Sequence, residues 1–187
     1  MESLITKLSN IRVHNLFKKT SKSKYHPKPN NILNIELEIT LKCNSTCPQC
    51  SRHCNFISYG DSDMTMEQIN KFINQVLLSD MVIGHITIMG GEPTVHPHFE
   101  KITLLLYESL VQTQKVSLLE IATNGIIGIP ESILKLPIKI RMGPPSIKKH
   151  RCQFIAPKDA GQETKFCDVP YVCGTALNCY GYFPCGA

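Results

Sequence analysis

The stretch that decides the fold is residues 32–50, which read ILNIELEITLKCNSTCPQC. Its first half alternates apolar and polar residues, and this two-residue period predicts a β-strand with one buried face. The apolar positions of the alternation are Leu33, Ile35, Leu37 and Ile39. The strand runs directly into a loop with three closely spaced cysteines, Cys43, Cys47 and Cys50. Several thiols at the end of a strand indicate a site for metal or redox chemistry.

Strands and helices alternate in the residues that follow, up to 142. Thr65 and Gln68 have the pattern of a capping box, which predicts the start of a helix whose apolar face extends to Leu77. Further strands are predicted at 83–89, 116–123 and 138–142, and further helices at 99–111 and 130–136. Such repetition predicts parallel strands joined by right-handed crossovers. Four strand–helix units are about half of an eight-unit barrel, so the predicted class is α/β, a partial and incomplete TIM-like (β/α) barrel with an open sheet.

The chain divides into three parts in this interpretation. Residues 1–31 combine a short amphipathic helix with a basic linker, and residues 32–145 form the partial-barrel core. Residues 146–187 form a cysteine-rich lobe that is expected to be rich in loops, because the hydrophobic periodicity fades after Pro144-Pro145.

Length, composition and charge exclude several classes of protein. The chain has 187 residues, of which 42% are hydrophobic, and this suits one packed domain with an appendage. Seven of the 20 basic residues but one of the 15 acidic residues fall within 1–29, so basicity belongs to the N-terminal arm and no nucleic-acid partner is expected. Without an apolar run of about 20 residues or a secretory signal, the protein is predicted to be soluble and cytoplasmic, with no membrane partner.

The nine cysteines favour metal binding over a disulfide framework, because the number is odd and no secretory signal is present. Cys43, Cys47 and Cys50 can hold three corners of a [4Fe–4S] cluster, and a missing fourth thiolate leaves one iron open to an outside ligand. Cys54 is an alternative fourth ligand that would close the site. A zinc knuckle or unrelated free thiols are the other interpretations of this loop when it is taken alone.

A second motif, Gly90-Gly91-Glu92-Pro93, follows the second predicted strand. In a parallel sheet it emerges at the same edge as the cysteine loop, which is the edge where α/β sheets place ligands. The two glycines allow the backbone to approach a ligand closely, and Glu92 offers a carboxylate to an ammonium group. The alternative is a glycine-rich turn with a helix-capping glutamate.

Together these residues resemble the radical S-adenosylmethionine (SAM) enzymes, in which a Cys-x3-Cys-x2-Cys loop follows the first strand and Gly-Gly-Glu follows the second. The resemblance covers residues 32–142. The cluster ligands that it implies are Cys43, Cys47 and Cys50. The residues that it places near the methionyl part of SAM are Gly90, Gly91 and Glu92, with Asn124 at the end of the third strand as a further candidate.

The resemblance also implies an activity. The open iron would chelate the amino and carboxylate groups of SAM, and one-electron reduction would cleave SAM to a 5′-deoxyadenosyl radical that abstracts hydrogen from a substrate. The expected protein is therefore a radical SAM enzyme of oxidoreductase type, and its implied partner is a one-electron reductant such as flavodoxin or ferredoxin.

Two features depart from the family pattern. Gln49 stands where many members have an aromatic residue near the adenine, and the later barrel strands that usually complete the adenine and ribose pocket are missing. Arg141, Ser146 or the basic run 148–151 are candidate substitutes, although a solvated loop is the alternative for the run. The histidines near the motifs are interpreted as packing or capping residues: His53, His96 and His98.

The C-terminal segment resembles the SPASM or twitch extensions that carry auxiliary iron–sulfur clusters in peptide-modifying members of the family. The candidate ligands are Cys167, Cys173, Cys179 and Cys185. This resemblance implies a peptide or protein substrate, while structural zinc or no metal are the alternatives for the segment. A non-catalytic or truncated module that binds an iron–sulfur cluster or zinc is the competing interpretation of the chain.

Overall fold

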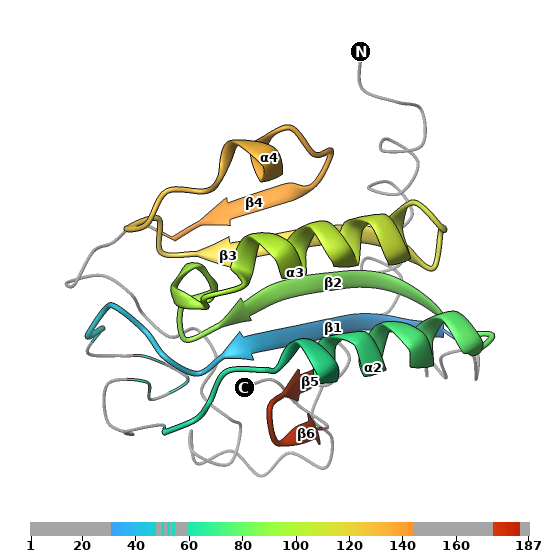
Figure 1. Cartoon of the computed structure of the whole chain (residues 1–187), viewed down its shortest axis with the longest axis horizontal. Coiled ribbons are helices and arrows are strands. Elements are labelled where there is room, and N and C mark those ends of the chain that lie inside the picture. The colour runs from blue at the N-terminus through green and yellow to red at the C-terminus, as the bar shows by residue number, and fades with distance from the viewer. Residues whose placement is uncertain are drawn as a thin grey trace, which may run out of the picture.

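Six strands form one open sheet in the computed structural model, which describes residues 31–47, 50, 52, 54, 60–143 and 174–183 (Figure 1). The strands are β1 (Asn31–Thr40), β2 (Val82–Gly90), β3 (Val116–Thr123), β4 (Lys139–Met142), β5 (Thr175–Asn178) and β6 (Gly181–Phe183). Their order is β4-β3-β2-β1-β5-β6, and each neighbouring pair is parallel except β5 with β6. The predicted open α/β sheet of parallel strands is confirmed.

Helices connect β1 to β2, β2 to β3 and β3 to β4, and they lie in front of the sheet in Figure 1. They are α2 (Met66–Leu78), η1 (Pro93–Val95), α3 (Phe99–Leu106), η2 (Tyr107–Val111) and α4 (Glu131–Leu134). The predicted capping box opens α2, since Thr65 Oγ1 accepts from Gln68 N at 3.2 Å and Gln68 Oε1 accepts from Thr65 N at 2.8 Å. The predicted helix at 99–111 is α3, continued by the π-helical turn η2.

Aliphatic side chains from the central strands form the core beneath these helices. The register sets Leu37 beside Ile88, and Ile88 beside Ile121, and all three side chains are fully buried. Buried residues of α2, α3 and α4 join the same cluster, which contains among others Ile69, Phe72, Ile102, Leu106 and Ile133. Burial of this apolar face is the main contribution to stability that the described fold offers.

The alternate positions of the strands carry polar side chains on the opposite face. Glu36 lies beside Thr87, Thr87 beside Glu120, and Glu120 beside Lys139 along the register. A parallel sheet that is covered on both faces by apolar packing has hydrophobic residues at such positions. One face of the sheet is therefore apolar and lies under the helices. We call the opposite face, which carries Glu36, Thr87 and Glu120, the polar face.

Strands β5 and β6 are a part of the fold that the sequence analysis did not predict. They lie in the segment that was expected to be rich in loops, yet β5 pairs with β1 and sets Leu177 beside Leu37. Ala176 and Leu177 are buried by this pairing. Strands of four and three residues are too short to show a hydrophobic period, which explains why the pattern was missed.

The expected N-terminal helix and the basic run 148–151 lie outside the described residues, as do Gln49, His53 and Ser146. Within the part of the chain that is described, no helix combines the length and the apolarity needed to cross a membrane.

Candidate functional site

The two motifs meet at the carboxyl ends of β1 and β2. Gly91 N donates to Thr40 O at 2.9 Å, and Glu92 N donates to Lys42 O at 2.8 Å. Lys42 immediately precedes Cys43, so the Gly-Gly-Glu turn is hydrogen-bonded to the start of the cysteine loop. The structure therefore brings together the two segments that the sequence analysis placed at one edge of the sheet.

Steric limits explain the two glycines of this turn. Gly90 has a φ of +146°, and a Cβ built on it would overlap the carbonyl oxygen of Thr40. A Cβ on Gly91 would overlap the carbonyl group of Lys42. The close approach that requires glycine in this structure is thus between the ends of two strands, whereas the sequence interpretation assigns it to a ligand.

Glu92 is enclosed, with 1% of its surface exposed. Its Oε1 accepts from Thr94 N at 3.1 Å, Thr94 Oγ1 at 2.6 Å and Thr123 Oγ1 at 2.7 Å, and its Oε2 accepts from Asn124 N at 2.6 Å. The carboxylate therefore caps η1, as the alternative interpretation held, and also ties β2 to the end of β3. An ammonium group that contacted this carboxylate would share it with four protein donors.

Asn124 joins the same site from β3. Its Nδ2 donates to Asn44 Oδ1 at 2.8 Å, and its Oδ1 accepts from Ile126 N at 2.9 Å. Because Asn44 follows Cys43, this side chain connects the turn after β3 with the cysteine loop. The candidate residues of three successive strand ends are thus held to one another by hydrogen bonds.

The cysteine loop presents half-buried thiols at this edge. Cys43, Cys47 and Cys50 are partly exposed, and Cys47 Sγ lies 3.3 Å from Ser45 Oγ. Burial is the largest influence on Cys43 and raises its pKa, a hydrogen bond with the Ser45 backbone opposes this, and Glu92, Cys50 and Cys47 raise the pKa further. The thiols therefore lie within electrostatic reach of one another.

The donor chemistry fits an iron–sulfur cluster. Three thiolates gathered in one loop would repel one another, and the cationic core of a cluster would relieve that repulsion. Within the described residues, no group of three or more histidine, cysteine or acidic side chains is arranged to hold a single metal ion. The fit thus rests on the type, spacing and location of the thiols.

Cys54 places a fourth thiol beside the loop. Burial, followed by the proximity of Cys50, raises its pKa to about 12. Its Sγ lies 3.8 Å from the carbonyl oxygen of Arg52. Cys54 as a fourth ligand that closes the site is therefore supported by its position in the structure as well as by its spacing in the sequence, and this alternative is tested below.

Arg52 is a residue of the site that the sequence analysis missed. Its guanidinium contacts Glu36, Glu38 and Met89 on the polar face. One signal was available, since Glu36 and Glu38 occupy alternate positions of β1 where apolar residues would be ordinary, and an arginine follows closely after Cys50. Arg141, a candidate for the adenine pocket, lies on the same face, where its Nε donates to Glu120 Oε1 at 2.6 Å.

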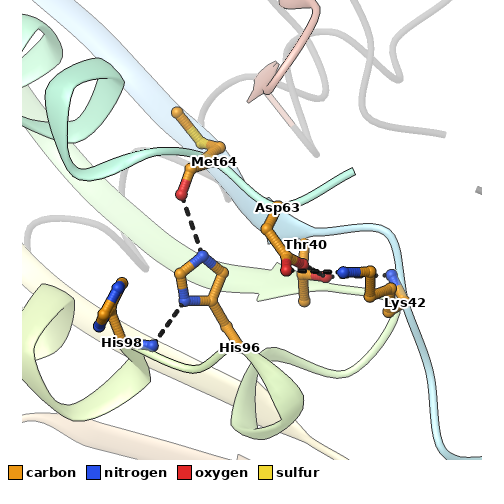
Figure 2. A network of polar contacts seen from close by, with 6 residues as sticks. All are labelled: Thr40, Lys42, Asp63, Met64, His96 and His98. Atoms are coloured by element: carbon orange, nitrogen blue, oxygen red, sulfur yellow. Dashed lines mark hydrogen bonds and ion pairs between the residues drawn. The ribbon is translucent and has the colours of Figure 1, made fainter. Parts of the chain in front are cut away.

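His96 has the packing role that was predicted for it. The ring accepts at Nδ1 from His98 N at 3.0 Å, so Nε2 carries the proton and donates to Met64 O, also at 3.0 Å (Figure 2). Burial lowers the pKa of this imidazole, which favours the neutral form that these two hydrogen bonds need. Beside it, Asp63 accepts from Lys42 Nζ at 2.8 Å and from Thr40 Oγ1, which fastens the start of the cysteine loop.

Cys179 is the described member of the C-terminal cysteine group. It packs at the margin of the hydrophobic core, and its carbonyl oxygen accepts from Gln68 Nε2 at 2.8 Å. Burial raises its pKa. The other three candidate ligands, Cys167, Cys173 and Cys185, lie outside the described residues.

Comparison with known proteins supports the fold assignment. The structure is similar to BtrN, seen in a crystal structure in complex with AdoMet and 2-DOIA, with a TM-score of 0.53 and 18% identity over 82% of this chain and 73% of that chain. Streptococcus suis SuiB bound to the precursor peptide SuiA gives a TM-score of 0.42 and 20% identity over 65% of this chain and 25% of that chain. The sequence matches no family model and no curated protein. The likeness to BtrN shows a shared fold.

Proposed function

We propose that this protein is a radical SAM enzyme. The observation that carries the proposal is the hydrogen-bonded junction between the Gly90–Glu92 turn and residues 40–42, which lead directly into the Cys43–Cys50 loop, at the carboxyl ends of adjacent parallel strands. Ligands of α/β sheets bind at such an edge. The fold shared with BtrN, whose crystal structure contains AdoMet, is consistent with this proposal.

Each part of the site has a proposed task. Cys43, Cys47 and Cys50 would hold a [4Fe–4S] cluster, which when bound supplies the electron that cleaves SAM. The backbone of the Gly90–Glu92 turn would face the methionyl group, while the Glu92 carboxylate keeps this turn in place through Thr123 and Asn124. The polar face would receive the part of the substrate that reacts.

The proposal also includes a substrate class, an auxiliary cluster and a reductant partner. A peptide or protein substrate, and an auxiliary cluster on Cys167, Cys173, Cys179 and Cys185, rest on the resemblance of the C-terminal segment. A one-electron reductant such as flavodoxin or ferredoxin would supply electrons in the cytoplasm. The substrate, the auxiliary cluster and the reductant are independent of the junction between the two motifs, so each is tested separately.

Anaerobic reconstitution tests the central proposal. The reconstituted protein should contain iron and sulfide, the EPR signal of the reduced cluster should change when SAM is added, and dithionite with SAM should yield 5′-deoxyadenosine. A cluster whose signal ignores SAM, with no 5′-deoxyadenosine formed, would refute an enzyme of this class.

A closed four-thiol module is the competing function, and the fourth thiol of Cys54 beside Cys50 favours it. Four thiolates saturate the coordination of structural zinc or of a closed cluster, so no position remains for SAM. Zinc in place of iron, or a cluster that Cys54→Ala removes, would favour this module.

A further inference from the structure

Arg52 fastens the far end of the cysteine loop to the polar face. Its Nη2 donates to Glu36 Oε2 at 2.8 Å and lies 3.4 Å from Met89 Sδ, while its Nη1 forms an ion pair with Glu38. The arginine side chain is 15% exposed and that of Glu38 is 6% exposed, so the guanidinium lies inside the protein above β1 and β2. Arg52 stands two residues after Cys50 and two before Cys54, so its anchorage restrains the chain that carries both thiols.

The second carboxylate extends this network to β5. Glu38 Oε2 accepts from Asn178 Nδ2 at 2.9 Å, and this hydrogen bond is buried. One guanidinium is therefore connected to β1 through two carboxylates, to β2 through Met89 and to β5 through Glu38. An anchor with contacts to three strands cannot shift without breaking several hydrogen bonds.

Stability alone does not account for this arrangement. The burial of charged groups carries a desolvation cost that their mutual attraction offsets only when the geometry is good, and apolar residues at positions 36 and 38 would be ordinary in a parallel sheet. The guanidinium is planar and its donors point in fixed directions. Its pairing with two carboxylates therefore sets both its orientation and its distance from them, which an apolar contact does not do. The network is thus suited to holding a chain segment in one position.

We propose that Arg52 is the positioning residue that holds Cys50 and Cys54 at the carboxyl end of β1. This proposal goes beyond the proposed function, because it concerns the metal-free loop and applies whatever group the thiols bind. In the metal-bound protein the same anchor fixes where the third thiolate is presented and which charges surround it.

Hydrogen–deuterium exchange of the reduced, metal-free protein tests the anchor directly. Arg52→Gln should raise the exchange rate of the peptide that covers residues 43–54 by roughly tenfold, because the loop loses its buried tie. Glu38→Gln should also raise the exchange rate. Arg52→Lys should restore part of the protection because the positive charge is kept, but not all of it, since the lysine ammonium lacks the planar set of donors. Lys135→Gln is the matched control, because it removes an exposed ion pair with Glu131 that is far from the loop in sequence.

A second measurement separates positioning from a general structural role. After reconstitution, Arg52→Gln should bind as much iron as the parent protein but should shift the EPR spectrum and the midpoint potential of the cluster, and Arg52→Lys should bring both back toward the parent values. If Arg52→Gln does not fold, Arg52→Lys and Glu38→Gln carry the test.

Two outcomes overturn the proposal. One is unchanged exchange of residues 43–54 in the folded glutamine variants, and the other is exchange that rises equally in the loop and in the peptides of β1 and β2. If the exchange of the loop changes as expected but the protein binds no iron–sulfur cluster, the proposed function is refuted and the proposal for Arg52 stands.

Discussion

At the scale of single residues, the hydrogen bonds of Glu92 decide how its substitution should be read. Glu92→Gln replaces one acceptor oxygen by an NH2 group, so at least one of the donors on Thr94, Thr123 and Asn124 loses its partner. We expect the metal-free protein to lose about 1.5–3 kcal/mol of unfolding free energy, measured by urea titration. SAM affinity of the loaded protein should fall as a consequence, with iron content near that of the parent. An unchanged unfolding free energy together with weaker SAM binding would instead assign the carboxylate to the ammonium group.

Gly91 offers a steric test at the same turn. In Gly91→Ala the new methyl group would overlap the carbonyl groups of Lys42 and Leu41, so the turn must move away from the cysteine loop. The expected loss is about 1–3 kcal/mol of unfolding free energy, with reduced cluster loading. Gly128→Ala is the matched control, because a Cβ there meets no atom within 4 Å. Equal unfolding curves for the two variants would contradict the close approach.

The cysteines allow the open and the closed site to be distinguished. Alanine at Cys43, Cys47 or Cys50 should abolish the SAM-binding cluster and with it the formation of 5′-deoxyadenosine. Cys54→Ala should preserve both, since the proposed function leaves one iron for SAM. Iron content, EPR and product analysis on the four variants check this. A folded Cys54→Ala protein that no longer cleaves SAM would require a ligand role for that thiol.

At the scale of elements, long periodic segments were predictable and short or long-range features were not. The strand that ends before Cys43 and the helix that begins at Thr65 follow from their own periods and caps, which are local properties. The position of β5 beside β1 depends on a contact between residues far apart in the chain, and four residues carry no period that predicts it. Glu36 and Glu38 were the available signal for Arg52, but the fold, and not the neighbouring sequence, brings the arginine beside them.

The candidate site shows the same division between local and long-range information. Sequence spacing predicted that Cys43 and Gly91 lie at one edge, because both follow parallel strands. It left open whether the Glu92 carboxylate binds a ligand or caps a helix, and it did not predict the hydrogen bonds from Thr123 and Asn124, since a glutamate that binds a ligand and one that ties two strand ends have the same sequence signature. Distances between side chains were needed to tell these roles apart.

The ion pairs that join Glu120 of β3 to the edge strand β4 give a pH-dependent prediction. Burial alone would raise the pKa of Glu120, but hydrogen bonds from His85, Lys139 and Arg141 hold it down at about 2, below the ordinary value of 4.5. Because the folded-state pKa is lower, this carboxylate contributes stability that is present above pH 4.5 and is lost as the pH falls toward 2. Glu120→Gln should therefore cost about 2 kcal/mol of unfolding free energy at pH 7 and less at lower pH.

Urea titrations from pH 7 to pH 3 measure this difference. The control is Glu131→Gln, whose carboxylate pairs with Lys135 at an exposed position and should contribute about 1 kcal/mol or less. A stability difference between Glu120→Gln and the parent that stays constant over this range would show that the carboxylate acts through packing and not through its charge.

At the scale of the whole molecule, the sheet divides its tasks between two faces and one edge. The apolar face under α2 and α3 supplies the core, the candidate site lies at the carboxyl edge, and the polar face carries the ion pairs of Arg52 with Glu38 and of Arg141 with Glu120. The strand β5 extends this sheet from the C-terminal segment, with Leu177 in the core and Asn178 hydrogen-bonded to Glu38. Part of the C-terminal segment is therefore structural for the core sheet.

This division determines how the auxiliary cluster should be tested. Deletion of residues 152–187 would remove β5 together with the cysteines, so a loss of iron could come from damage to the sheet. Joint replacement of Cys167, Cys173 and Cys185 by alanine leaves β5 intact and is the sharper variant. The parent should bind roughly eight irons if both sites hold [4Fe–4S] clusters, and the triple variant about four.

The first cluster should remain functional in that triple variant. Its proposed ligands and the Gly90–Glu92 turn do not include the replaced residues, so SAM should still perturb the EPR signal and 5′-deoxyadenosine should still form, while turnover of the true substrate fails. Thermal unfolding that matches the parent would show that the sheet is undamaged. About four irons in the parent protein, with zinc released from the triple variant, would identify the C-terminal site as structural zinc. Four irons and no zinc in either protein would rule out a metal site in that segment.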